Sequence, residues 1–423
     1  MSLDPTLLDD LEWRGLLAHS TDLDALREAL ASGSVRFYVG FDPTAPSLHL
    51  GNLVQILTAK RLQDAGHTPY ALVGGATGMI GDPRDSGERT LNDADTVSQW
   101  VERVRRQIEP FLSFEGENAA TMVNNLDWTQ GLSTIDFLRD IGKHFPVNRM
   151  LARETVKRRL EAGGISYTEF SYVLLQSMDF LSLYREHGVT LQFGGSDQWG
   201  NITGGAELIR RAAGASVHAF ATPLITKSDG TKYGKTEGGA LWLDPTMLSP
   251  YAFYQFWLNV EDEKVGELLR IFTFLPRAEI EELEATHAEK PFLRAGQKAL
   301  AEHVTTLVHG AEETARIQAA SAALFGGGDM SSLSADTLGA ALGEAGTVSV
   351  ERAAMPTITD LLVEAGLAKS KGEARRTVGE GGAYLNNERV EDPELVPGAE
   401  HLIGGRWLVL RKGKKSFKGV EVR

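Results

Sequence analysis

The sequence contains no cysteine at all. This absence excludes disulfides, thiolate zinc sites and a cysteine nucleophile, and it is consistent with a reducing cytoplasm. Long apolar runs are missing too, since no stretch approaches the roughly 18 residues that suggest a membrane span. The N-terminal segment MSLDPTLLDDLEWRG is acidic and lacks the basic start and apolar run of a secretory signal. We therefore expect a cytoplasmic protein with no membrane partner.

Positive charge is scarce overall, and it is unevenly distributed. The 423 residues carry a formal net charge of −14. Residues 356–423 hold 12 basic and 10 acidic side chains, whereas residues 1–355 hold 31 basic and 47 acidic ones. The stretch 406–423 alone has seven basic residues and one acid. A phosphate backbone would be attracted to this end, although a solvated charged terminus has the same composition.

Strand and helix patterns alternate along the first half of the chain. Segment 35–40 (VRFYVG) is typical of a strand, 53–66 has helical spacing, and 68–75 (TPYALVGG) is typical of a second strand. The alternation continues with helices near 95–113, 133–160 and 170–187 and with strands near 121–126, 190–193 and 217–225. This order predicts an α/β fold with a parallel sheet and right-handed connections.

The rest of the chain changes character twice, and its length allows two to four domains. We expect a first domain over 1–248 with a helical insertion at about 91–160, and an α-helical domain over 249–324. The Gly/Ser/Ala-rich stretch 325–355 is interpreted as a flexible linker with at most one weak helix. A small α+β module follows over 356–423, with helices at 358–367 and 370–381 and strands at 383–390, 401–405 and 407–417.

The first chemically informative segment is 49–52 (HLGN), which opens a helix directly after the loop that follows the first strand. Free N–H groups and the dipole at a helix N-terminus favour phosphate. His49 can donate to a phosphate oxygen, and Gly51 lets a ribose or base approach the backbone. Taken alone, this short pattern is more often a capped helix with a surface histidine.

The second segment is 226–236 (TKSDGTKYGKT), which contains Lys232, Lys235 and Thr236. A P-loop is excluded because three residues separate Gly230 from Gly234, where that motif has four. A glycine-containing loop with several lysines can neutralise charge as pyrophosphate leaves a triphosphate. A solvated surface loop is the alternative.

A third cluster lies on the helix predicted at 170–187. Offsets of four and three residues place Tyr172, Gln176 and Asp179 on one face. Polar groups on an otherwise apolar helix indicate a pocket, and a partly exposed helix is the alternative. The segment 192–201 (QFGGSDQWGN) follows it.

The first two segments together resemble the HIGH and KMSKS signatures of class I aminoacyl-tRNA synthetases, with Asn52 as a departure. The third cluster and QFGGSDQWGN look like bacterial-type tyrosyl-tRNA synthetases, a resemblance that covers about residues 10–420. It implies a Rossmann-like catalytic domain over 1–248, an anticodon-side helical domain and a C-terminal RNA-binding domain. The implied reaction converts L-tyrosine and ATP to tyrosyl-adenylate and pyrophosphate, then transfers tyrosine to tRNA(Tyr) in protein biosynthesis. It also implies Mg²⁺ with the ATP, no zinc or other metal site, and a homodimer with 145–167 near the two-fold axis.

The same resemblance assigns roles to individual residues. The phenol would be bonded by Tyr38 and Asp179. The amino acid's ammonium group would be held by Tyr172, Gln176 and Asp82, with Gln198 nearby. The nucleotide would meet Asp42, Gly40, Gly51, Gly195, Asp197 and Lys235. The catalytic set would be Thr44, His49, Asn52, Arg89, Lys232, Lys235 and Thr236, and Arg84 is a candidate substitute for a lysine that relatives carry in the loop at 81–90.

The C-terminal module resembles the α-L RNA-binding domain of ribosomal and RNA-modifying proteins, through 370–376 (SKGEARR) and 382–386 (GAYLN). The candidate phosphate contacts are Lys369, Lys371, Arg375, Arg376, Arg411, Lys412, Lys414 and Lys415. Two other functions are compatible with parts of the pattern: a tryptophanyl-tRNA synthetase, and a non-catalytic RNA-binding paralogue. The presence of His49, Lys232 and Lys235 disfavours the paralogue.

Overall fold

The computed structural model describes residues 3–83, 91–231, 233–236, 239–326, 330, 333–413 and 416–423. The chain divides into two compact units. The first comprises Met1–Met247 and Glu261–Gly296, and the second comprises Leu248–Val260 and Gln297–Arg423. No helix in these described ranges is both long and apolar enough to cross a membrane.

The first unit is built on a six-stranded sheet with the order β1-β6-β5-β2-β3-β4. All neighbouring strands are parallel except β1 and β6. The strands are β1 (His19–Ser20), β2 (Arg36–Phe41), β3 (Thr68–Val73), β4 (Thr121–Asn124), β5 (Leu191–Gly195) and β6 (His218–Thr222). Helices cover both faces, which explains why the central strands are near-continuous apolar runs.

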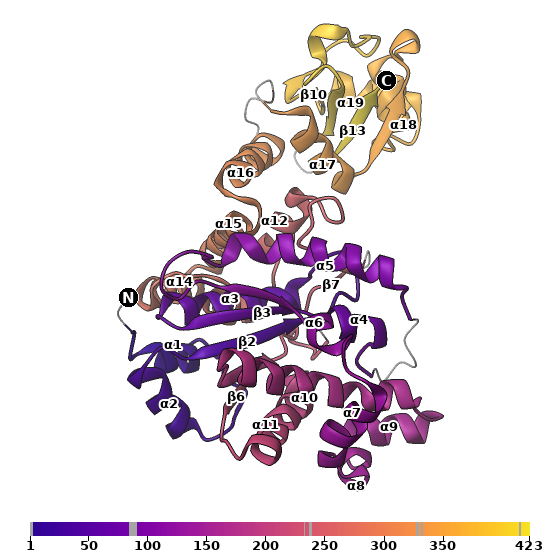
Figure 1. Ribbon diagram of the computed structural model, residues 1–423. Coiled ribbons are helices and arrows are strands. Elements are labelled where there is room, and N and C mark those ends of the chain that lie inside the picture. Colours follow the sequence, from indigo (N-terminus) through magenta and orange to yellow (C-terminus); the bar gives the residue numbers. More distant parts are fainter. Residues whose placement is uncertain are drawn as a thin grey trace. The chain divides into compact units, whose positions relative to one another are not determined.

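Helices of the first unit pack on opposite faces of this sheet, with α5 on one side and α10 and α11 on the other (Figure 1). The main α-helices are α1 (Leu7–Trp13), α2 (Leu23–Ser32), α3 (Leu50–Asp64), α4 (Gly75–Ile80), α5 (Ala94–Ile108), α6 (Leu126–Thr129), α7 (Thr134–Asp136), α8 (Val147–Leu151), α9 (Glu154–Ala162), α10 (Tyr167–His187), α11 (Trp199–Ala213), α13 (Val265–Phe272) and α14 (Arg277–Glu289). Strand order reverses between β2 and β5, so a crevice is expected outside the carboxyl ends of these strands.

The second unit combines helices with a five-stranded sheet of order β11-β10-β12-β13-β9. Its helices are α12 (Pro250–Leu258), α15 (Ala295–His309, beginning at the unit boundary), α16 (Ala311–Gly326), α17 (Ala335–Ala345), α18 (Ile358–Glu364) and α19 (Lys371–Gly379). Its strands are β9 (Thr347–Val350), β10 (Ala383–Leu385), β11 (Glu388–Arg389), β12 (Trp407–Lys412) and β13 (Ser416–Val422). Leu361, Leu408, Leu410 and Val420 are fully buried in the core of this sheet and its helices.

The stretch 325–355 differs from the flexible linker that its composition predicts. Helix α17 occupies 335–345, and strand β9 pairs in parallel with β13. The β-branched run TVSV forms this strand because β13 offers it an edge, a partner that lies about 70 residues away and that local composition does not reveal. The helical stretch 249–324 is also divided: α13 and α14 belong to the first unit, and α12 and α16 belong to the second.

Two predicted strands of the C-terminal module also differ. The segment 401–405 forms only a single bridge, between Ile403 and Trp407, after a short 3₁₀ turn (Ala399–His401). The segment 407–417 is not one strand, because the chain turns at Gly413, where φ is 63°, and returns as β13.

Candidate active site

The carboxyl ends of the parallel strands bring most of the predicted residues together. Tyr38 and Gly40 lie on β2, Asp42 directly follows it, and Gly195 ends β5. Gly40 and Gly51 are exposed, and so are Thr44 and His49. The predicted nucleotide and phosphate residues therefore line an open rim, whereas Tyr38 is buried beneath them.

The start of α3 is held by a reciprocal cap. His49 Nδ1 accepts from the Gly51 N–H at 3.1 Å, and Asn52 Oδ1 accepts from the His49 N–H at 3.0 Å. Such a cap satisfies N–H groups that a helix start would otherwise leave open. Asn52, the departure from the family signature, thus has a defined role in the free site, because it fixes the backbone of His49.

The two signature segments lie next to each other although about 180 residues separate them. The Leu50 N–H donates to the Leu241 carbonyl at 3.1 Å, and the Leu241 N–H donates to the Gly234 carbonyl at 2.7 Å. At Gly234 φ is 80°, and a Cβ there would lie 2.8 Å from Leu50, so only glycine fits. The backbone of Lys235–Thr236 forms the short strand β7, paired with β8 (Gly239–Ala240).

Several residues predicted from these motifs lie outside the described part of the chain. They are Lys232, Arg84 and Arg89, and of Lys235 and Thr236 only the backbone is described.

Asp179 is the most deeply buried acid of the site, with 2% of its surface exposed. Its two oxygens accept from Asn125 Nδ2 at 3.1 Å and from Trp128 Nε1 at 2.9 Å. Burial raises the pKa of Asp179 to about 7, although both hydrogen bonds oppose that rise. Tyr38 is 1% exposed, and its hydroxyl has no hydrogen-bond partner within the described ranges. Burial, followed by the nearby charge of Asp179, raises the pKa of Tyr38.

Asp42 connects the nucleotide side of the site with the amino-acid side. It accepts hydrogen bonds of 2.6 Å from the hydroxyls of both Tyr172 and Thr77. Thr77 in turn accepts from Asn125 Nδ2 at 2.9 Å. A Cβ at Gly74 would lie 2.2 Å from Asp42 Oδ1, so the close approach of this backbone requires glycine. Asp42, predicted to face ribose and adenine, is therefore also a support for Tyr172.

Asp82, Gln198 and Asn201 form a second polar cluster. Asp82 accepts from Gln198 Nε2 at 2.9 Å and from Asn201 Nδ2 at 3.1 Å. Gln176, on the same helix as Tyr172 and Asp179, has a buried Oε1 without a hydrogen-bond partner among the described residues. Two amides therefore gather around the acid Asp82, and the Gln176 oxygen keeps acceptor capacity for a cation.

Sequence reasoning missed five residues that support this site: Trp128, Asn125, Thr77, Asn201 and Arg153. One signal was available for two of them. Asn125 and Trp128 follow immediately after β4, and residues at the carboxyl ends of parallel strands commonly serve the site. The other three are recognisable only from their partners in the fold.

Three of the candidate RNA-binding residues form ion pairs with carboxylates of the same unit. Lys371 pairs with Asp360 at 2.5 Å, Arg375 with Glu394 at 2.9 Å and Lys412 with Glu373 at 2.6 Å. Lys369 and Arg376 are exposed, and Lys414 and Lys415 lie outside the described residues.

Arg411 is directed differently from the rest of that set. Its guanidinium donates to the Leu324 carbonyl near the end of α16, where the helix dipole favours a cation. Asn387 donates to the neighbouring Ala323 carbonyl at 2.8 Å. Arg411 is therefore a link between the module and α16, which the charge pattern alone did not indicate.

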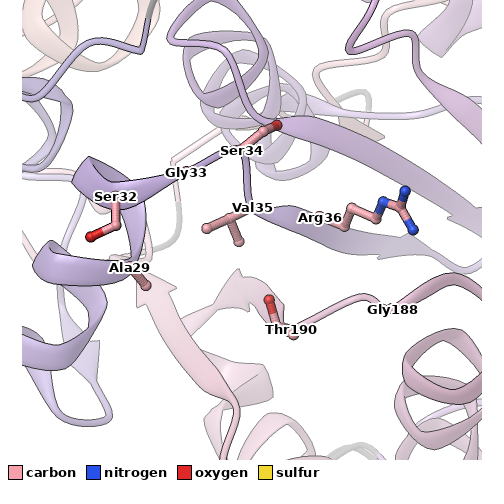
Figure 2. Close-up of a pocket in the computed structure, with 8 residues that line it drawn as sticks. All are labelled: Ala29, Ser32, Gly33, Ser34, Val35, Arg36, Gly188 and Thr190. Carbon is pink, nitrogen blue, oxygen red and sulfur yellow. The ribbon is translucent and has the colours of Figure 1, made fainter.

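A surface pocket of about 540 Å³ lies at the opposite, amino-terminal ends of β2 and β5. Figure 2 shows the residues that line it, none of which was predicted from the motifs. Two polar groups here already have partners within the chain: Arg36 donates to the His187 carbonyl at 2.7 Å, and the Val35 N–H donates to His67 Nδ1 at 3.2 Å. We assign this pocket no role in the site.

Comparison with known proteins identifies the family of the chain. Residues 30–326 match the family model described as tRNA synthetases class I (W and Y), and residues 340–420 match a tyrosine–tRNA ligase C-terminal domain. Over 418 residues the chain is 64% identical to the tyrosine–tRNA ligase of Streptomyces coelicolor, covering 98% of this chain and 99% of that protein. The chain belongs to the tyrosine–tRNA ligase family.

Two further relatives agree. The tyrosine–tRNA ligase of Kineococcus radiotolerans is 60% identical over 414 residues, 98% of each chain. The crystal structure of a C-terminally truncated mitochondrial tyrosyl-tRNA synthetase from Aspergillus nidulans superposes with a TM-score of 0.67 at 30% identity. That match covers 74% of this chain and 92% of the other. Membership in this family confirms the predicted α/β fold with its helical region and small α+β domain, and it disfavours the tryptophan and non-catalytic alternatives.

Proposed function

We propose that the site at the carboxyl ends of β2 and β5 activates L-tyrosine with ATP and transfers it to tRNA(Tyr). In the first step a carboxylate oxygen of tyrosine attacks the α-phosphorus of ATP, and the bond to pyrophosphate breaks. In the second step a ribose hydroxyl at the 3′ end of the tRNA attacks the acyl carbon, and AMP leaves. Protein catalysis of such transfers is mostly positioning and stabilisation of charge.

The observation that carries this proposal is the buried Tyr38 hydroxyl, which has no hydrogen-bond partner among the described residues and lies within reach of the charge of buried Asp179. An unmatched buried hydroxyl beside a carboxylate costs free energy unless a ligand bonds it. The phenol of tyrosine can bond both groups, because it can donate to the Asp179 carboxylate and accept from the Tyr38 hydroxyl. An indole N–H could donate to Asp179 but could not accept from Tyr38, which favours tyrosine over tryptophan.

The ammonium and carboxylate ends would then reach toward the rim. We assign the ammonium group to Asp82, Tyr172 and Gln176, with Gln198 supporting Asp82. ATP would lie over Gly40, Gly51, Gly195 and Asp197, with its phosphates toward Thr44, His49 and the segment that carries Lys232 and Lys235. Magnesium would enter bound to the triphosphate. The adjacency of Leu50 and Gly234 supports a joint action of the two segments on these phosphates.

For the tRNA we propose the exposed cations of the C-terminal module, Lys369, Lys371, Arg375 and Arg376, together with Lys412, Lys414 and Lys415. Three of them have carboxylate partners, which phosphates would have to displace. Arg411 is removed from this proposal because it already binds α16.

We also propose a homodimer. Large apolar side chains are exposed between residues 135 and 167, and they are Ile135, Leu138, Val147, Leu151, Leu160 and Tyr167, with exposures from 40% to 68%. Exposed apolar side chains gathered in one segment commonly mark an interaction surface. This segment overlaps the stretch 145–167 expected near a two-fold axis. The absence of cysteine supports our placement of the protein in the cytoplasm.

ATP–pyrophosphate exchange measured with each of the twenty amino acids tests the proposal. We expect exchange with tyrosine, followed by charging of tRNA(Tyr) when tRNA is added. Exchange driven by tryptophan instead, or no exchange with any amino acid, would overturn it.

A further inference from the structure

A relay of side-chain amides connects the Asp82 carboxylate to a half-buried arginine on a different element. Asn201, in the first turn of α11, donates through Nδ2 to Asp82 Oδ1 at 3.1 Å and to Gln198 Oε1 at 3.2 Å. Gln198 donates through Nε2 to Asp82 Oδ2 at 2.9 Å. Both oxygens of Asp82 therefore accept an amide N–H.

Arg153 lies at the other end of this relay, in the turn between α8 and α9. Its NH1 donates to Asn201 Oδ1 at 3.0 Å, and its NH2 donates to the Gly200 carbonyl at 2.6 Å. One guanidinium thus holds both the side chain of Asn201 and the backbone just before it. The fork geometry of arginine suits two acceptors at fixed separation, which a lysine ammonium cannot reproduce with the same rigidity.

The direction of hydrogen bonding in the relay follows from Arg153. A carboxamide has an accepting end and a donating end, and it can rotate to exchange them. A guanidinium only donates, so it selects the orientation in which the Asn201 oxygen faces Arg153. The Asn201 NH₂ group then faces Asp82 and the Gln198 oxygen, which leaves the Gln198 NH₂ group for Asp82. In the reversed orientation the Asn201 oxygen would face the oxygens of Asp82 and Gln198, and these contacts are repulsive.

We propose that Arg153 is a positioning residue for the ammonium group of the amino-acid substrate. It fixes the orientation of Asn201 and Gln198, and through them the orientation of the Asp82 carboxylate. Its own positive charge repels an ammonium ion, so its contribution is geometric. This inference rests on the proposed function, because it takes Asp82 as the group that binds the ammonium.

The test compares Arg153→Met and Arg153→Lys with Arg105→Gln, a control that removes an exposed arginine of α5 from its ion pair with Glu109. Exchange kinetics give the KM values for tyrosine and ATP. Inhibition by 3-(4-hydroxyphenyl)propionate, which has the phenol and carboxylate but no ammonium, reports the rest of the pocket. For Arg153→Met we expect the tyrosine KM to rise about tenfold, the effect of losing one hydrogen bond to a charged group. The ATP KM and the inhibitor constant should stay unchanged, Arg153→Lys should fall between, and the control should match the parent.

Two results overturn the inference. One is an unchanged tyrosine KM in both Arg153 variants. The other is an equal loss of affinity for tyrosine and for the analogue that lacks the ammonium group. Thermal unfolding shows whether Arg153→Met still folds, and Arg153→Lys remains informative if it does not. Asp82→Asn separates this inference from the proposed function. If Asp82→Asn weakens the binding of tyrosine and the Arg153 variants do not, only the role proposed for Arg153 is wrong. If Asp82→Asn also has no effect, the ammonium site itself is misassigned.

Discussion

Charged side chains have opposite surroundings in the proposed tyrosine pocket of the first unit and in the proposed RNA-binding surface of the second unit, which comprises Lys371, Arg375 and Lys412. In the pocket, Asp179 is buried, and its hydrogen-bond donors among the described residues are neutral, Asn125 and Trp128. On the basic surface, Lys371, Arg375 and Lys412 have opposite charges as partners and keep substantial contact with solvent. Burying a charge costs free energy unless a well-placed partner bonds it, so a buried carboxylate discriminates strongly between ligands. Exposed ion pairs contribute little to stability and exchange partners easily. This difference supports the proposal that the first region selects one small ligand and that the second contacts phosphates in varied arrangements.

The largest effect is expected from removing the buried carboxylate. Asp179→Ala should lower kcat/KM for tyrosine by about 10³ or more, while Tyr38→Phe should lower it about tenfold, because one partner of the phenol survives. Sites that bond a substrate hydroxyl reject the analogue without it by about 10⁴–10⁵, a range established on this same type of enzyme. Exchange assays with tyrosine and phenylalanine measure both variants. If both keep the parental ratio of the two substrates, the pocket has been misassigned.

The next effect concerns the lysine segment at the rim. Lys235→Ala should slow adenylate formation by about 10²–10³ with little change in tyrosine binding, because charge on the departing pyrophosphate develops only in the transition state. Pre-steady-state measurements at saturating tyrosine and ATP give this rate. Lys290→Ala, which changes an exposed lysine of the same unit, is the control and should leave the rate unaltered. A parental rate in Lys235→Ala would contradict the assignment.

Removal of the C-terminal module should separate adenylate formation from tRNA binding. The cut belongs after Gly326, because α17 contacts β12 and β13 and β9 pairs with β13. We expect near-normal exchange. The affinity for tRNA should fall by roughly 10², because several phosphate contacts are lost. The salt slope, which is the change of log affinity with log salt concentration, should become smaller for the same reason. Exchange, charging and tRNA binding across a salt series measure this. Equal salt slopes in both forms, with equal charging per adenylate, would leave the module without an RNA-binding role.

Burial of Asp179 should also appear in the pH dependence of stability. Its pKa rises from 3.8 to about 7 on folding, so the folded state binds the proton more tightly than the unfolded state. The contribution of Asp179 to stability is therefore highest below about pH 4, falls as the pH rises toward about 7, and is level above it. Ionisation of Asp179 in its buried site lowers the free energy of unfolding by up to about 4 kcal/mol. Asp179→Asn cannot ionise, so the difference in unfolding free energy between this variant and the parent should shift in favour of the variant across that interval. A difference independent of pH would show that folding does not raise the pKa of Asp179.

The smallest effect distinguishes two arginines of the second unit. Arg376→Ala should reduce the salt slope of tRNA binding by about one without changing thermal stability, because its side chain is exposed. Arg411→Ala should leave the salt slope unchanged and lower stability by about 1 kcal/mol, because a carbonyl at the end of α16 loses its donor. The two measurements together sort each cation into RNA contact or internal link, and the reverse outcome would exchange the two assignments.

Sequence patterns predicted the α/β sheet well because buried parallel strands are short apolar runs separated by helical spacing. The pairs β2–β3 and β5–β6 lie close to their expected positions. The motif residues were found for the same local reason: His49 and Asn52 cap a helix, and Tyr172 and Asp179 share a helix face. Strand β9 and the cap formed by Arg411 were missed, because each depends on a partner more than 70 residues away.

By itself the sequence determined the parallel strands of the first unit, the motifs and the family, since these reside in local spacing and in residue types at fixed offsets. Only the tertiary structure decided which polar side chains form hydrogen bonds with one another. It placed Trp128 and Asn125 on Asp179, Tyr172 on Asp42 and Arg153 on Asn201. The physical reason is that the energy of a buried polar group depends on the atoms that replace its water, and those atoms come from distant parts of the chain.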